Sequence, residues 1–153
     1  MKSLFYFLIC ISFSLLIACG SKENNAATAG DNSSDKEAIS ADPKLDKGVG
    51  PITSLTLNEK IDDVMAKKGL EIFNAKCTAC HKPDKKYIGP APKGILDRRS
   101  PEFVMNMILK PEKMIAENDL VKQMVGEYNG AVMANQNLTE EEARAVLEYF
   151  RTL

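Results

Sequence analysis

Apolar residues recur at the three- and four-residue spacing of an α-helix in several stretches of the chain. The first stretch begins near Leu57 and leads directly into Cys77. Its apolar positions are Ile61, Met65, Gly69, Ile72 and Phe73. A glycine on the apolar face costs a helix about 1 kcal/mol relative to alanine, so we expect Gly69 to let another helix approach closely.

Capping residues mark the starts of the later helices. Ser100, followed by Pro101 and Glu102, provides a hydroxyl cap, a proline in the first helical position and an acid in the first turn. Pro111 is expected to end this helix and to begin another, which continues to about Gly126. Their apolar faces are Phe103, Met107 and Ile108 in the first helix and Met114, Val121, Met124 and Val125 in the second.

The C-terminal stretch has the clearest helical pattern. Thr139 and Glu142 have the spacing of a capping box. Apolar residues follow at Ala143, Val146, Leu147 and Phe150. No run of residues alternates with the period of two that a strand requires. We therefore predict an all-α domain of about 95 residues, which is small for a hydrophobic core without an added staple.

The N-terminal residues show a different pattern. Lys2 precedes an apolar run that reaches Ala18, and the sequence turns polar after Cys19, as in an export signal. Leu16, Ile17, Ala18 and Cys19 resemble the lipobox of bacterial lipoproteins. That resemblance implies that residues 1–18 are a cleaved signal peptide, that Cys19 is lipidated, and that the protein is anchored to a bacterial membrane, facing the periplasm. An uncleaved anchor is the alternative, because the run approaches the length of a spanning helix.

Residues 19–50 are mostly small and polar, so we interpret them as a flexible tether with a reach of roughly 30 Å. Residues 51–153 are then the folded domain. The pI of 5.9, and the few aromatic residues in the basic stretch from Lys76 to Arg99, do not favour binding to nucleic acid. Between Lys76 and Arg99, seven basic residues accompany two acidic ones, which indicates either a solvated surface or a docking surface for an acidic partner.

The candidate chemistry is concentrated in residues 77–81, which contain Cys77, Cys80 and the only histidine, His81. The spacing Cys-x-x-Cys-His is the attachment signature of c-type haem, in which both thiols bond the vinyl groups and the imidazole binds the iron. A zinc site requires four ligands, and the chain offers no second histidine and no spare thiol. A thioredoxin-like pair requires strands between helices, which the sequence pattern does not show. A disulfide across so tight a loop would add little stability. We therefore predict one covalent haem c, whose apolar macrocycle also supplies the missing staple.

The sixth ligand of the iron decides the function, and methionine is the usual partner of a single histidine. Met65, Met107 and Met124 fall on or beside apolar helical stripes and are interpreted as core residues, whereas Met105 and Met114 are left open. Met133 differs, because it lies among glycine and asparagine residues six positions before Thr139. A loop of this kind can carry a thioether to the face of the iron opposite His81, so Met133 is the predicted ligand.

The chain from about Leu57 to Leu153 resembles a monohaem class I cytochrome c. The resemblance rests on Gly69 and Phe73 before the haem motif, on the sequence Ile-Gly-Pro-Ala-Pro at 88–92, on the methionine in a late loop, and on the closing helix. It implies a small fold of about four to five helices around one covalent haem. It also implies that Gly69 and Phe73 pack against Tyr149 or Phe150.

The resemblance further implies roles for residues around the haem. The Pro90 carbonyl accepts a hydrogen bond from Nδ1–H of His81, which fixes the ring and raises its basicity. The tryptophan that often contacts a haem propionate in this family is absent from the chain. Tyr87, Arg98 and Arg99 are the candidates to replace it.

Iron bound by His81 and Met133 has no vacancy for oxygen, peroxide or substrate. The predicted protein is therefore a single-electron carrier rather than an enzyme. Its expected redox partners are a quinol-oxidising complex or a cytochrome as donor and a terminal reductase or oxidase as acceptor. An open-site haem sensor or peroxidase, and a haem subunit of a larger reductase or oxidase complex, are the alternatives.

Overall fold

The computed structural model describes residues 42–153. The predicted signal peptide, the lipidated Cys19 and the tether as far as residue 41 lie outside the described residues. Within the part of the chain that is described, no helix has both the length and the apolar character needed to cross a membrane.

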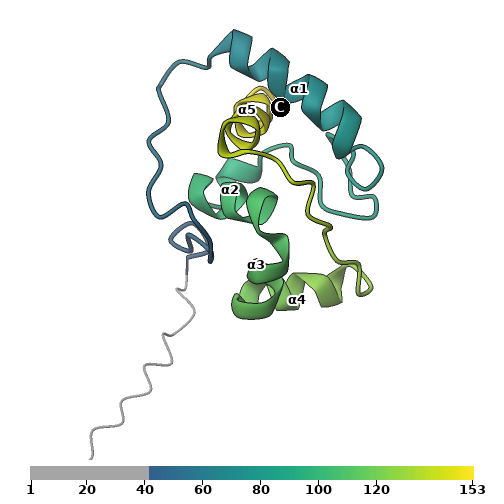
Figure 1. Ribbon diagram of the computed structural model, residues 1–153. Helices are drawn as coiled ribbons and strands as arrows, with labels where there is room; N and C mark the ends of the chain where they lie inside the picture. The colour runs from purple at the N-terminus through teal and green to yellow at the C-terminus, as the bar shows by residue number, and fades with distance from the viewer. Residues whose placement is uncertain (1–41) are drawn as a thin grey trace, which may run out of the picture. The chain divides into compact units, whose positions relative to one another are not determined.

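The domain consists of five α-helices and one short 3-10 helix, and no strand occurs between residues 42 and 153 (Figure 1). The elements are α1 (Asp63–Lys76), η1 (Ile95–Asp97), α2 (Pro101–Leu109), α3 (Pro111–Glu117), α4 (Asp119–Glu127) and α5 (Glu140–Phe150). The predicted caps are present, because Ser100 accepts from the amide of Phe103 and Thr139 forms a capping box with Glu142. The all-α prediction is therefore confirmed.

Helices α1 and α5 cross in close contact at one end of the domain (Figure 1). A Cβ atom on Gly69 would lie 1.9 Å from the carbonyl oxygen of Ala145, so only glycine allows this approach. The ring of buried Phe73 packs 5.4 Å from that of Tyr149 and 5.8 Å from that of Phe150, as predicted. The packing of Gly69 differs from the prediction, because its nearest neighbours are backbone atoms of α5 rather than an aromatic ring.

Helix α1 begins at Asp63, later than the predicted start near Leu57. The side chain of Asp62 caps the helix by accepting from the amides of Val64 and Met65. The amide of Asp62 in turn donates to Oε1 of Glu148, at 2.9 Å. A distant side chain on α5 therefore sets the entry to the helix that leads into the cysteines.

Glu148 is buried, with 1% of its surface exposed, and is surrounded by partners for its charge. Its carboxylate pairs with Arg144 and Arg151, and Arg151 also donates to the carbonyl oxygen of Asn58, at 2.6 Å. Burial favours the neutral acid, but the amide of Asp62 and the two guanidinium groups outweigh burial and hold the pKa of Glu148 below its usual value. The charged network joins the segment before α1 to the C-terminal helix α5.

The predicted single helix from Pro111 to about Gly126 is two helices, α3 and α4. The break falls at Asn118, whose backbone is extended and whose side chain caps α4 by accepting from the amide of Val121, at 3.0 Å. The Nδ2 group of Asn118 also donates to Asp46, at 2.9 Å. This second bond ties the break between α3 and α4 to Asp46, in the segment before α1.

The segment of residues 46–55 contains several bends and packs against α2 and α3. Asn106 accepts from the amide of Ile52 and donates to the carbonyl oxygens of Lys47 and Ile52. Ser100 donates to the carbonyl oxygen of Asp46, at 2.7 Å. The contacts of the domain therefore reach back to Asp46, into the stretch assigned to the tether.

Candidate haem site

The segment after α1 brings two thiols and the imidazole together. Cys77 is the C-terminal cap of α1, and its carbonyl oxygen accepts from the amides of Cys80 and His81, at 3.1 and 2.9 Å. This tight turn places all three side chains on the wall of one cavity. Burial raises the pKa of the Cys77 thiol, whereas Cys80 is exposed.

The imidazole of His81 is oriented by its neighbours at positions 89 and 90. Nδ1 of His81 lies 2.8 Å from the carbonyl oxygen of Pro90, the contact that the resemblance implies. A Cβ atom on Gly89 would lie 2.5 Å from Cε1 of the ring, so a side chain at this position would displace the imidazole. The bond to Pro90 leaves the other ring nitrogen available to a metal.

Two adjoining cavities, of about 190 and 100 Å³, lie beside the imidazole. They share much of their lining, so we treat them as one space and call it the slot. The shared lining residues are Cys77, His81, Pro90, Met107, Met124, Met133 and Gln136. Between them, α1, α2, α4 and α5 all contribute to the walls of the slot.

The donor set of the slot fits a c-type haem. Two thiols and a nitrogen ligand come from one turn, thioethers are available on the same walls, and most of the other lining residues are apolar. In residues 42–153, the slot included, no group of three or more histidine, cysteine, aspartate or glutamate residues is placed to hold a metal ion by itself. Among the uses weighed for the two cysteines, haem attachment is the one that this surrounding supports.

Three methionines line the slot, although the sequence predicts a ligand role for Met133 and core positions for Met107 and Met124. Met133 lies there, as expected of a ligand, but Met107 and Met124 do too, although their stripes predict core positions. Met105 and Met114 are fully buried and do not line the slot. The question left open for Met105 and Met114 is thereby answered, because both belong to the hydrophobic core.

Of the three propionate candidates, only Arg99 reaches the slot. Its Nε atom is buried without a hydrogen-bond acceptor, and Nη2 lies 3.7 Å from the sulfur of Met124. Arg98 instead donates to the carbonyl oxygens of Ala91 and Lys93. The ring of Tyr87 is exposed and lies below the amino group of Lys82. An unpaired donor beside the slot is suited to an anionic group such as a propionate.

Sequence reasoning missed three kinds of residue at the slot. Gln136 lines both cavities and donates to the carbonyl oxygen of Ala134, and only its place three residues after Met133 could have suggested it. Tyr128 lines the first cavity, but it belongs to no motif that could have indicated this. Ile88 and Val132 are exposed by 46% and 65% yet line the first cavity, which indicates an apolar rim at its mouth.

Comparisons with known proteins agree with this site. The family model for cytochrome c matches residues 66–153. A cytochrome c from Rhodothermus marinus is 45% identical, and the match covers 67% of this chain and 88% of that chain with a TM-score of 0.65. An engineered cytochrome c from Rhodothermus marinus is 44% identical, with coverages of 67% and 89% and a TM-score of 0.64.

A more distant structure shows the same fold. The cytochrome c domain of a Pseudomonas putida protein is 26% identical and covers 55% of this chain and 85% of its own, with a TM-score of 0.50. No curated protein sequence matches the chain. The family model spans more than half of the chain and includes Cys77 and Cys80. The chain therefore belongs to the cytochrome c family, and it is an electron-transfer haem protein that binds haem c covalently.

Proposed function

We propose that this protein is a single-electron carrier in which His81 and Met133 are the axial ligands of a haem attached through Cys77 and Cys80. The observation that carries the proposal is that all four side chains line one cavity. When bound, the haem iron accepts and releases one electron, and a methionine ligand raises its reduction potential.

The chain's own residues hold the site in one arrangement. The Pro90 carbonyl accepts a hydrogen bond from Nδ1–H, which fixes the tautomer of His81 and raises the basicity of its second nitrogen. Gly89 leaves room for the ring in that orientation. Arg99 is the residue that we assign to a propionate, because its buried Nε lacks an acceptor. A rigid site of this kind changes little between oxidation states.

We place the domain outside the cytoplasm, on a lipid anchor at Cys19. The support is the lipobox-like sequence that ends at Cys19, after residues with the pattern of an export signal. The polar residues that follow would confine the domain within roughly 30 Å of the membrane and raise its effective concentration near membrane enzymes. Its donor would be a quinol-oxidising complex or a cytochrome, and its acceptor a terminal reductase or oxidase.

The basic residues of the segment after α1, residues 77–99, which we call the attachment segment, support docking to an acidic partner. Lys85, Lys86 and Lys93 are exposed on this segment, which also contributes Ile88 to the apolar rim of the slot. Charges in this position would speed encounter at low ionic strength, and salt would screen them. The rate of electron transfer to an acidic partner should therefore fall as salt is added. A rate that is independent of salt would remove this part of the proposal.

Carbon monoxide binding tests the proposed ligation. Iron that already holds His81 and Met133 should bind carbon monoxide slowly after reduction, because the thioether must leave first. Met133→Ala should bind it rapidly, and Met105→Leu, a change in the core away from the slot, should behave as wild type. Rapid binding by wild type would instead support an open-site sensor or peroxidase.

A further inference from the structure

The two walls of the slot belong to different parts of the chain. Cys77, Cys80 and His81 lie on the segment after α1, whereas Met124 and Met133 lie on α4 and on the loop that follows it. Helix α4 packs mainly against α3 and has a single buried residue, Val121. The wall that carries the proposed sixth ligand therefore has little core packing of its own.

The loop around Met133 is held to the domain on its C-terminal side by Asn135. The Nδ2 group of Asn135 donates to the carboxylate of Glu112, at 3.1 Å, and lies 3.4 Å from the carbonyl oxygen of Leu109. These contacts join the loop to α2 and α3. They do not join it to the wall that carries His81.

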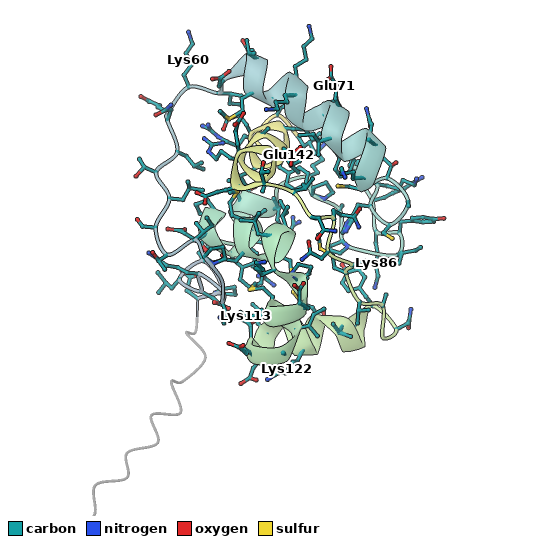
Figure 2. All side chains as sticks on the ribbon, viewed as in Figure 1. Lys60, Glu71, Lys86, Lys113, Lys122 and Glu142 are labelled. Carbon is teal, nitrogen blue, oxygen red and sulfur yellow. The ribbon has the colours of Figure 1, made fainter. Side chains whose placement is uncertain are left out.

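Lys86 supplies that second connection. Its Nζ atom donates to the carbonyl oxygen of Glu127, at 3.1 Å, and lies 4.2 Å from the centre of the Tyr128 ring. Lys86 comes from the attachment segment, and Glu127 and Tyr128 end α4. Figure 2 shows Lys86 between these two parts of the chain. We call these contacts the Lys86 latch.

The electrostatics of α4 favour the latch. The last carbonyl groups of a helix lack partners within it and carry partial negative charge, which a cation stabilises. The last turn of α4 has no basic residue, so the cation is supplied by Lys86, from 41 residues earlier. The face of the Tyr128 ring adds a cation–π contact to the same amino group.

We infer that Lys86 is a positioning residue for the sixth ligand: beside the slot it connects the segment that carries His81 to the end of α4, and it keeps the Met133 loop closed on the iron. The inference rests on the proposed ligation by Met133. With the latch in place, opening of the loop must break the contacts to Glu127 and Tyr128 as well as the bond from sulfur to iron. Without the latch, the loop should open more often, and an external ligand should replace Met133 faster.

Lys82 offers a matched control for this test. Its Nζ atom also donates to a backbone carbonyl, that of Thr78, at 2.9 Å, and it also lies over an aromatic ring, that of Tyr87, at 5.0 Å. Both partners of Lys82 belong to the attachment segment itself. Removing Lys82 therefore removes the same chemistry without separating the two walls.

The experiment measures the rate at which imidazole replaces the sixth ligand in the oxidised holoprotein, by stopped-flow absorbance. Lys86→Gln should react about tenfold faster than wild type, the factor expected for the loss of a charged hydrogen bond with a cation–π contact. Lys86→Arg should restore most of the difference. Lys82→Gln should react at the rate of wild type. Tyr128→Leu should also react faster, and it provides a second variant if Lys86→Gln matures poorly.

Three results would overturn the inference. Equal rates for Lys86→Gln, Tyr128→Leu and wild type would show that the latch does not hold the loop. An equal increase for Lys82→Gln would show that the effect is one of surface charge. A wild-type spectrum without the charge-transfer band from sulfur to iron would refute both the ligation by Met133 and the role of the latch. A normal band with unchanged rates would refute the role of the latch alone.

Discussion

Replacing Gly69 with alanine tests how closely α1 approaches α5. The added Cβ atom would lie 1.9 Å from the carbonyl oxygen of Ala145 and 2.9 Å from the amide nitrogen of Val146. Both are backbone atoms, so no side chain can rotate away from the new methyl group. The helices would have to separate by about 1 Å to reach the 3.0 Å that real Cβ contacts respect.

Two effects of opposite sign determine the result. Alanine favours a helix by about 1 kcal/mol relative to glycine, whereas overpacking a tight interface costs about 1–3 kcal/mol or more. Because the clash involves backbone and the Phe73 contacts lie one turn away, we expect the upper end of that range and a net loss of about 2 kcal/mol. The shift would also move Cys77, at the end of α1.

Gly126→Ala is the matched control, because a Cβ atom there would have no heavy atom within 4 Å. In that variant the helix preference acts alone, and we expect a gain of about 0.5 kcal/mol near the end of α4. Unfolding of the holoproteins in guanidinium chloride, followed by circular dichroism, gives both free energies. A Gly69→Ala variant as stable as wild type, or two variants that shift in the same direction, would refute the reasoning.

Three further changes give equally definite results. Glu148→Gln should lose about 3 kcal/mol at neutral pH, because the half-buried guanidinium groups of Arg144 and Arg151 lose their charged partner. Since the folded-state pKa of Glu148 is lowered, the stability that it provides is present at neutral pH and is lost as pH falls through that pKa. The free energy of unfolding of the variant should therefore depend less on pH in the acid range. Gly89→Ala should displace the ring of His81 and change the visible spectrum of the oxidised protein, and a spectrum identical to wild type would contradict the close contact. Arg99→Leu should make the reduction potential depend more strongly on pH, because a propionate without its donor titrates closer to neutrality. Arg98→Leu should leave that dependence unchanged, since Arg98 donates to backbone carbonyls. Cyclic voltammetry over a pH series distinguishes these two results.

Features that depend on neighbouring residues could be predicted from the sequence. The caps at Ser100 and Thr139 need only the residues one turn away, and both form as predicted. The haem motif likewise lies within one turn, between Cys77 and His81. The packing of Phe73 on the closing helix followed from the family resemblance rather than from any local pattern.

Features that depend on distant residues could not be predicted. The start of α1 is set partly by Glu148, and the break before α4 is held by Asp46, more than 70 residues away from Asn118. Helical periodicity also shows that Met107 and Met124 face inward, but it cannot distinguish a packed core from a slot for a cofactor. The sequence also could not show which of Arg98 and Arg99 contacts the haem, because only the fold decides which side chain reaches the slot.

The most direct test of the central proposal is the near-infrared spectrum of the oxidised holoprotein, measured for wild type and for three methionine variants. His81 and Met133 as axial ligands predict a weak charge-transfer band from sulfur to iron in wild type. Met133→Ala should lose the band, whereas Met107→Leu and Met124→Leu should keep it although both residues line the slot. A band that persists in Met133→Ala, or a high-spin wild-type spectrum without it, would contradict the proposed ligation.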